Sequence, residues 1–288
     1  MRKLGVLANP RKDRVEPVLQ LLAKKAGQCG MTLVTCDQTA ELVPGAEKVD
    51  VDNFSGSIDA LMALGGDGTM LRAVRLLGRS DKPVLGVNLG SLGFLTSITE
   101  DDLDSAIDAL LKDDYLVSNR TMVSCRVSRD SQGRDFCTAL NDIVIGWGTV
   151  SRAITLDLEI DGESVASYLC DGLIVSTPTG STGHSLSAWG PIVHPESPVL
   201  LVNVICPHTL SGRPLVLTDK SRIGVSITDI PADKKLLLSA DGQEELPLEA
   251  GDRVEITKLA EPVRIINLKG YSYFSVLRQK LNWHGSHK

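Results

Sequence analysis

The spacing of apolar residues changes once along this chain, near Ser118, and that change constrains the fold more than any other feature. Before Ser118, short apolar runs alternate with segments of helical spacing. The runs that predict strands cover residues 3–9, 31–36, 59–64 and 83–90, and the helical segments begin near residues 13, 69 and 103. Nearly continuous apolar strands that alternate with helices are typical of a parallel sheet covered on both faces. The first part of the chain is therefore predicted to form an α/β domain.

Beyond Ser118 the apolar residues recur at every second position. In residues 154–160 apolar side chains alternate with polar ones, and residues 222–227 and 253–256 repeat the pattern. This period predicts strands of a half-solvated antiparallel sheet or sandwich. Residues 272–283 return to helical spacing. An all-β domain is thus expected to follow the α/β domain closely, because no low-complexity linker separates them.

The first predicted helix has one apolar face, which is made by Val15, Val18, Leu19, Leu22 and Ala26. Asp13 and Glu16 have the spacing of a capping box, with Asp in place of the usual Ser or Thr. Gly27 is expected to end the helix.

Composition excludes several classes of partner. The chain has 288 residues, a formal net charge of -6 and a pI of about 5.4, which argues against nucleic acid and anionic membrane surfaces as partners. Aromatic residues make up 4%, too few for a base-stacking platform. The six cysteines form no C-x-x-C pair, and no apolar stretch suits a signal peptide or a membrane span. We therefore expect a cytoplasmic protein with reduced thiols.

Residues 63–73 read ALGGDGTMLRA, where three glycines surround Asp67 between a predicted strand and a predicted helix. Open α/β sheets bind ligands at such junctions, and glycines let backbone amides approach phosphate. The spacing matches neither the Walker loop nor the dinucleotide fingerprint. A carboxylate at this place fits a base, an acceptor for an attacking hydroxyl, or a magnesium ligand in phosphoryl transfer. The alternative is a tight turn in which Asp67 caps the helix.

Two further stretches combine glycines with small polar residues. Residues 88–94 read NLGSLGF after a predicted strand, and with the first turn they suggest two loops that meet over one crevice. Residues 176–187 are dense in hydroxyl groups and glycines, which can hydrogen-bond a polar ligand, and Asp171 just before them adds a charge to an apolar strand. The alternatives are an ordinary strand–helix turn for the former, and a Ser/Thr-rich loop with a capped helix near Thr182 for the latter.

Together these stretches resemble one family, the NAD kinases. The family pattern GGDGT is matched by Gly65–Thr69, and the pattern N-x-G-x-x-G-F is matched by Asn88–Phe94. The remaining similar segments are the pair Asn141-Asp142, Asp171–Thr182, His208–Leu217, residues 241–243 and the closing LRQKLNW, so that the resemblance covers Leu4 to Trp283. GGDGT alone is shared with diacylglycerol and sphingosine kinases.

The resemblance implies a fold, a reaction and partners. The fold is an α/β, nucleotide-binding domain with a parallel sheet over residues 1–118, to which the C-terminal helix returns with residues 265–288, plus a β-rich, sandwich-like domain over residues 119–264 for NAD binding and oligomerisation. The reaction transfers the terminal phosphoryl group of ATP, or of polyphosphate, to the adenosine 2′-hydroxyl of NAD and makes NADP. Magnesium would enter with ATP, no metal would be bound tightly by protein side chains, and a homodimer or homotetramer is expected.

The resemblance also implies roles for residues of the first domain. Asp67 would orient and deprotonate the 2′-hydroxyl, and Gly68 would leave room for the ribose. Arg72, one helical turn further on, would meet phosphate, and Phe94 would pack on adenine.

In the second domain, Asn141 and Asp142 would hydrogen-bond the adenosine. Asp171 and a run of six residues would hold the nicotinamide half or a second subunit's adenosine; the run is Thr182, Gly183, His184, Ser185, Leu186 and Ser187. Arg152 and Gln243 complete the expected dinucleotide contacts, with a solvated surface charge as the alternative for Arg152.

Three positions depart from the family pattern. The usual Thr-Ala-Tyr-Ser is replaced at residues 182–185, where His184 brings an imidazole that titrates near pH ~6.5 in place of a phenol. Leu169 stands where an arginine is frequent, and Asp142 is one methylene shorter than the usual Glu. These departures bear on the dinucleotide contacts and on the preference between NAD and NADH.

Two other classes of function share parts of the pattern. A lipid kinase of the diacylglycerol or sphingosine type also has GGDGT, but no basic or apolar membrane-docking segment is visible here. A non-catalytic nucleotide sensor would bind NAD without making NADP, and would have no need of the Asp67 carboxylate. NAD kinase activity is the expected function, with the phosphoryl donor and the regulation left open.

Overall fold

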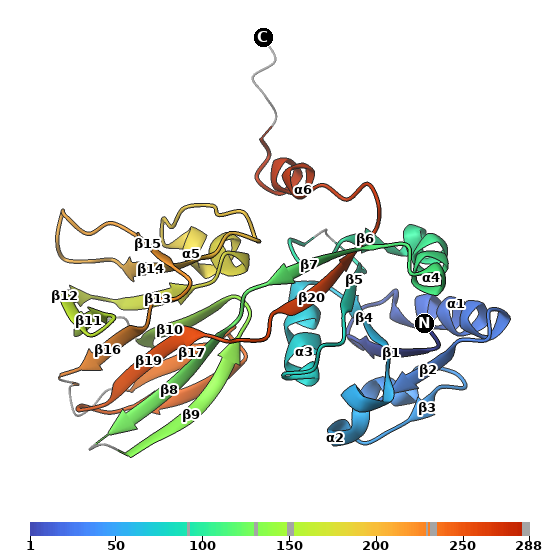
Figure 1. The fold of residues 1–288 in the computed structure, drawn as a ribbon, viewed down its shortest axis with the longest axis horizontal. Helices are drawn as coiled ribbons and strands as arrows, with labels where there is room; N and C mark the ends of the chain where they lie inside the picture. The colour runs from blue at the N-terminus through green and yellow to red at the C-terminus, as the bar shows by residue number, and fades with distance from the viewer. Residues whose placement is uncertain (91–92, 130–131, 149–152, 229, 231–234, 284–288) are drawn as a thin grey trace, which may run out of the picture. The chain divides into compact units, whose positions relative to one another are not determined.

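A computed structural model describes residues 1–90, 93–129, 132–148, 153–228, 230 and 235–283 (Figure 1). The chain forms two compact units. The first contains residues 1–119 and 263–288, and the second contains residues 120–262. Within the described residues, no helix is long and apolar enough to cross a bilayer.

The first unit is built on a largely parallel sheet in the order β3-β2-β1-β4-β5-β20-β7, with β6 paired to β5. Parallel pairing joins β1 to β2 and to β4, and joins β5 to both β4 and β20. The chain therefore returns to the first unit after the second one, as predicted, but it does so first with a strand, β20, where only a helix was predicted. The strands are β1 (Lys3–Ala8), β2 (Thr32–Thr35), β3 (Glu47–Lys48), β4 (Ala60–Gly65), β5 (Val84–Asn88), β6 (Ile98–Thr99), β7 (Leu116–Arg120) and β20 (Val263–Asn267).

Helices cover both faces of this sheet (Figure 1). The apolar sides of α1 (Val15–Gln28) and α4 (Leu103–Lys112) share one buried cluster with alternate residues of β1 and β4. The buried residues of α3 (Asp67–Leu77) lie outside that cluster, because α3 packs on the opposite face. The shorter helices of this unit are η1 (Asp37–Glu41), α2 (Val51–Phe54), η2 (Ser55–Ser57), η3 (Glu100–Asp102) and the C-terminal α6 (Tyr273–Lys280).

The second unit is a sandwich of two antiparallel sheets, in the orders β15-β14-β13-β10-β17-β18 and β12-β11-β16-β19-β8-β9. Alternate residues of both sheets form one core, in which Leu156 and Leu158 belong to one sheet and Leu173 and Val175 to the other. Apolar and polar residues alternate in the sequence because successive side chains of these strands point in turn to this core and to solvent. The elements are β8 (Val123–Arg129), β9 (Gln132–Ala139), β10 (Asp142–Trp147), β11 (Ile154–Ile160), β12 (Glu163–Cys170), β13 (Gly172–Ser176), η4 (Thr179–Thr182), α5 (His184–Ser187), β14 (Val199–Ile205), β15 (Leu215–Thr218), β16 (Ile223–Ile227), β17 (Leu236–Ala240), β18 (Glu244–Leu248) and β19 (Arg253–Lys258).

The ends of α1 differ from the prediction, although its apolar face is confirmed residue by residue. The helix begins at Val15 with Arg14 as its N-cap, and no side chain caps it, so the predicted capping box of Asp13 and Glu16 does not form. Gly27 lies inside the helix, and the chain turns at Gly30, which has a φ of +68°. A left-handed φ is what glycine tolerates best, so the second glycine is the one that the turn requires.

Candidate active site

Asp67 lies at the point of the first sheet where the strand order reverses. The chain places β2 on one side of β1 and β4 on the other, so the carboxyl ends of β1 and β4 border a switch point, where open α/β sheets bind ligands. Asp67 is the first residue of α3, directly after β4. At the same edge, the amide of Asn9 donates to the carbonyl of Leu64 over 3.0 Å and ties the two strand ends together.

The Asp67 carboxylate joins the two glycine-rich turns. Its Oδ2 accepts a hydrogen bond from the amide of Phe94, and its Oδ1 accepts one from the amide of Leu95, each at 2.9 Å. A Cβ at Gly93 would overlap the Asp67 carboxylate, so only glycine allows this approach. The two turns therefore meet, as predicted. Asp67 stays partly exposed, and a carboxylate has about four lone-pair sites, so capacity remains beyond the two amides.

The other predicted residues of the first unit lie close to these turns. Gly68 is exposed, and a Cβ there would meet no atom of the described residues within 4 Å, so the space that they leave beside it is open. Arg72 donates from Nη2 to the carbonyl of Ala8 at the end of β1, over 2.7 Å. The ring of Phe94 has the ammonium of Lys280, from α6, 6.0 Å from its centroid.

Sequence reasoning missed one cation at this edge, Lys12. It is half-buried, and a Cβ at Gly90 would lie 3.4 Å from its ammonium nitrogen, so Lys12 stands beside the second glycine-rich turn. The signal was the basic stretch PRKDR directly after the first strand. A charge run usually indicates a solvated surface, and only the sheet topology brings this one to the switch point.

Asn141 and Asp142 lie at the start of β10 in the second unit, next to Gly183. A Cβ at Gly183 would be 3.8 Å from both Asn141 Nδ2 and Asp142 Oδ2. The Oδ1 of Asn141 is buried and has no hydrogen-bond partner among the residues that the structure describes. Burial first, and then the charge of Asp241, raise the pKa of Asp142 to about 7, while a hydrogen bond from the His184 amide opposes the shift. Asp142 therefore gains or loses its proton near neutral pH.

The Ser/Thr-rich run divides into buried and accessible residues. Ser185 is fully buried, whereas His184 and Ser187 are exposed and Thr182, Gly183 and Leu186 are intermediate. The carbonyl of Ser185 accepts a hydrogen bond from Asn203 Nδ2 at 3.2 Å. This part of the chain forms two short helical turns, η4 and α5, rather than one longer capped helix.

The remaining predicted residues lie at the ends of strands. Asp171, between β12 and β13, is half-buried, and its amide donates a hydrogen bond to the carbonyl of Ile205 over 2.9 Å. Gln243 closes the turn between β17 and β18, where its amide donates to the carbonyl of Ala240 over 2.9 Å. Arg152 falls outside the described residues. Sequence reasoning assigned Gln243 but not Asp241, because an Asp-Gly pair between two strands indicates a turn and carries no sign of what the carboxylate contacts.

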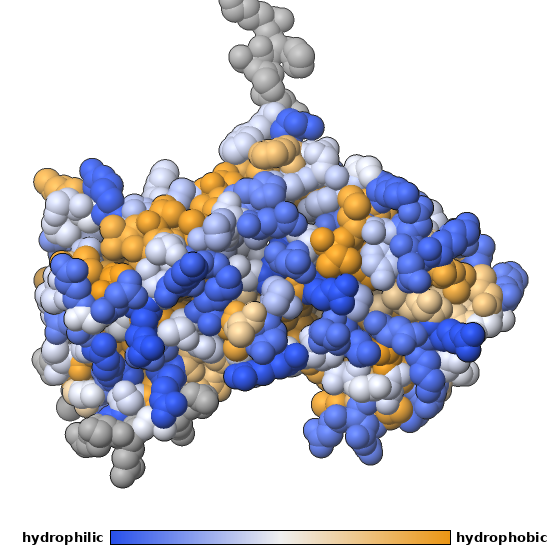
Figure 2. Space-filling model, viewed as in Figure 1, coloured by the Kyte–Doolittle hydropathy of each residue, from blue (hydrophilic) through white to orange (hydrophobic). Residues whose placement is uncertain are grey.

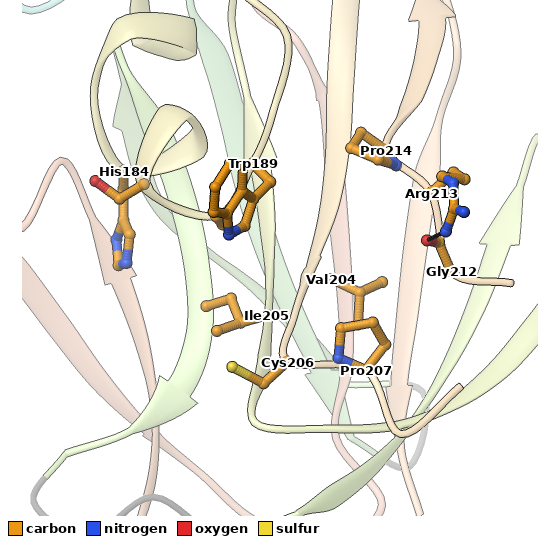
Figure 3. Close-up of a pocket in the computed structure, with 11 residues that line it drawn as sticks. His184, Trp189, Val204, Ile205, Cys206, Pro207, Gly212, Arg213 and Pro214 are labelled. Carbon is orange, nitrogen blue, oxygen red and sulfur yellow. Dashed lines mark hydrogen bonds between the residues drawn. The ribbon is translucent and has the colours of Figure 1, made fainter. Parts of the chain in front are cut away.

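A pocket of about 390 Å³ opens beside α5 (Figure 3). His184 and Trp189 line one side, and the chain from Val204 to Pro207 and from Gly212 to Pro214 lines the other. Trp189 is 91% exposed and has a left-handed φ of +63°. The volume is in the range of small-molecule sites.

An acidic residue in a glycine-rich turn, at the switch point of an α/β unit that is followed by a β-sandwich, suits the class of nucleotide-dependent phosphotransferases. Family models agree over most of the chain: residues 4–115 match the ATP-NAD kinase N-terminal domain, and residues 140–268 match the ATP-NAD kinase C-terminal domain. The chain therefore belongs to the NAD kinase family, and it is an enzyme that phosphorylates NAD.

Individual relatives and solved structures point the same way. The chain is 39% identical to an NAD kinase of Citrifermentans bemidjiense over 98% of this chain and 99% of that protein. It is 40% identical to an NAD kinase of Moorella thermoacetica, over 99% of this chain and 91% of that one. The crystal structure of yeast NADH kinase complexed with NADH has a TM-score of 0.91 at 25% identity, covering 100% of this chain and 89% of that chain. The crystal structure of an NAD kinase from Archaeoglobus fulgidus in complex with ATP shares the fold, with a TM-score of 0.75 at 24% identity. The match covers 99% of this chain and 100% of that chain.

Proposed function

We propose that Asp67 is the catalytic base of this NAD kinase and that the terminal phosphoryl group of ATP is transferred to the adenosine 2′-hydroxyl of NAD. The Asp67 carboxylate orients the hydroxyl and takes its proton. The 2′-oxygen then forms a bond to the γ-phosphorus while the bond from that phosphorus to the β–γ bridging oxygen breaks, which gives NADP and ADP. Magnesium enters as the ATP complex and neutralises charge on the phosphates.

The fixed position of the Asp67 carboxylate is the observation that carries this proposal. Two amides hold its orientation, so little reorganisation is needed when a hydroxyl approaches a remaining lone pair. Open space next to Gly68 suits a ribose. A carboxylate that served only to cap α3 would need no partner from a second turn, whereas this one is bonded to residues 94 and 95.

Cations and backbone amides at the same edge would stabilise the phosphate charge. Arg72 donates to the carbonyl of Ala8, which holds its guanidinium, a fork of N–H donors suited to phosphate, at the end of β1. Lys12 beside Gly90 supplies a second positive charge. We assign both residues to the phosphates and Phe94 to the adenine ring.

In the second unit, we assign Asn141 and Asp142 to the adenosine. The buried, unpartnered Oδ1 of Asn141 supports the assignment, because a buried polar atom without a partner costs about 1–3 kcal/mol and a ligand that reorients the amide would relieve that cost. Asp171, Gln243 and residues 182–187 are assigned to the rest of the dinucleotide.

We further propose a homodimer or homotetramer that forms through the second unit. Figure 2 shows apolar surface over the region of β14, β15 and α5, where Trp189, Leu210 and Val216 are exposed. β15 and β12 are also edge strands, which have unpaired backbone groups. Light scattering at several protein concentrations tests this, and a monomer at all concentrations would contradict it.

A cytoplasmic location is proposed because all six cysteines are free thiols. This includes Cys125 and Cys137, which face each other across β8 and β9 and yet form no disulfide. Reduced thiols are typical of compartments that also hold ATP and NAD. Fractionation of cells, with the protein followed by antibody, tests the location.

The reaction is tested by incubating the protein with NAD, magnesium and either ATP or polyphosphate. NADP is then measured with a dehydrogenase that accepts only the 2′-phosphorylated cofactor. We expect NADP to form with ATP, and the polyphosphate arm decides whether the donor site accepts a chain without adenosine. No NADP with either donor would contradict the proposal.

A further inference from the structure

The side chain of Asp241 contacts the start of the neighbouring strand β10, which carries the residues that we assign to adenosine. Asp241 lies in the turn between β17 and β18 and has a left-handed φ of +51°. Its Oδ2 accepts from the amide of Leu140 at 2.9 Å, and its Oδ1 accepts from the amides of Asn141 at 2.7 Å and Asp142 at 3.2 Å. One carboxylate thus binds three consecutive amides, and its own amide donates to the carbonyl of Asp142 over 3.0 Å.

The carbonyls of the same segment are held by the chain that follows β13. The Oγ1 of Thr177 donates to Leu140 O over 2.5 Å, and the amide of Thr177 donates to Asn141 O over 2.9 Å. Gly180 packs so closely that a Cβ there would overlap the Asn141 carbonyl. Residues 140–142 are therefore fixed through their amides by the Asp241 carboxylate, and the carbonyls of Leu140 and Asn141 are fixed by Thr177.

A carboxylate suits this place better than any neutral side chain. It offers two oxygens to three donors, whereas an asparagine offers one oxygen and would turn an NH₂ group towards an amide hydrogen. Hydrogen bonds to a charged group are also stronger than those between neutral groups. The turn alone does not explain the residue, because an Asp-Gly turn forms without such a network.

From this network we infer that Asp241 is a positioning residue for the acceptor dinucleotide, which it serves by fixing the backbone from which Asn141 and Asp142 project. The inference rests on the proposed function of those two residues. Asp241 touches neither reacting group, so its loss acts on NAD affinity and leaves ATP affinity and the chemical step unchanged.

Asp241→Asn tests the inference, with Glu245→Gln on the adjoining strand β18 as the control, because Glu245 is exposed. Affinity for NAD is measured by equilibrium titration, which needs no turnover, and KM for each substrate and kcat are measured separately. We expect affinity for NAD to fall about tenfold or more, with KM for ATP and kcat within about twofold of wild type. Unchanged NAD affinity in a folded Asp241→Asn protein would overturn the inference.

Thr177→Val provides a second route if Asp241→Asn does not fold. Valine matches threonine in shape but has no hydroxyl for the Leu140 carbonyl, so the segment loses one bond on its opposite edge. We expect the same selective loss of NAD affinity, and equal losses for NAD and ATP would overturn the inference. A wild-type protein that binds NAD but forms no NADP would contradict the proposed reaction and not this positioning role.

Discussion

Two residues near the assigned site, Asp142 and Trp189, are held in unfavourable states: one is a buried acid, and the other has a left-handed backbone conformation. Asp142 is a nearly buried acid whose pKa is raised to about 7. Trp189 combines a left-handed backbone with a side chain that is 91% exposed. Strain and unfavourable burial are commonly found at functional sites.

The raised pKa of Asp142 predicts a pH-dependent stability. Below pH about 4 the acid is protonated in both the folded and the unfolded chain. Between pH 4 and 7 the unfolded chain loses the proton first, so stability falls as the pH rises. The full cost above pH 7 is about 4 kcal/mol, from a shift of about 3 units. Asp142→Asn, which stays neutral, should therefore melt higher than wild type at pH 8 and about equally at pH 4 in scanning calorimetry; equal melting temperatures at pH 8 would contradict this.

Trp189 predicts a gain in stability on substitution by glycine. A left-handed φ costs a non-glycine residue about 1–2 kcal/mol, and the exposed indole contributes little packing in return. Trp189→Gly should raise the melting temperature. Trp189→Ala is the matched control, because it removes the indole but keeps the Cβ and its strain, so it should leave the melting temperature unchanged. Equal effects of the two variants would refute this reading.

At the scale of elements, two glycines near the end of α1, Gly27 and Gly30, have different roles. Gly27 lies inside the helix with nothing within 4 Å of a Cβ, and Gly30 has a φ of +68°. Gly27→Ala should therefore stabilise the protein by about 0.5–1 kcal/mol, and Gly30→Ala should destabilise it by a similar amount. Thermal melts of both variants check this, and the opposite order would place the helix end at Gly27.

Helix and strand types followed from the period of the apolar residues, whereas element ends and side-chain partners did not. Val15, Val18 and Leu22 identified a buried face, since burial repeats with the helical period. The N-cap could not be predicted, because capping chemistry favours Asp13, whereas the path of the chain from β1 places Arg14 at the N-cap. Asp67 was found from its glycines, yet its bonds to residues 94 and 95 depend on a separate turn.

Asp241 shows the same limit within the candidate site. Its partners lie about a hundred residues earlier in the chain, and only the pairing of β17 with β10 brings them together. No local pattern reports such a contact. Sequence reasoning therefore identifies chemical groups that follow strands, and the topology decides which of them share a site.

At the scale of the whole molecule, the two units differ in whether a single continuous segment of the chain forms them. The second unit is continuous, from residue 120 to residue 262, and has its own core. The first unit needs β20, which lies between β5 and β7 in the sheet and comes from beyond the second unit. The second unit is thus inserted into the sequence of the first.

This insertion predicts different outcomes when the units are expressed alone. Residues 120–262 should fold into a β-rich unit with a cooperative thermal transition, measured by circular dichroism. Residues 1–119 should not, because their sheet lacks β20, and joining residues 263–288 to residue 119 through a short linker should restore folding. A cooperative transition in residues 1–119 alone would contradict the role given to β20.

The central claim, that the Asp67 carboxylate accepts the proton of the attacking hydroxyl, is tested most directly by a single-turnover measurement. Asp67→Asn is mixed with magnesium, ATP and NAD at saturating concentrations, and NADP is followed in time beside wild type and Asp101→Asn, an exposed carboxylate elsewhere in the same unit. We expect the rate to fall about 10²–10⁴-fold in Asp67→Asn, with both substrates still bound, and to be unchanged in Asp101→Asn. A rate close to that of wild type in Asp67→Asn would contradict the claim.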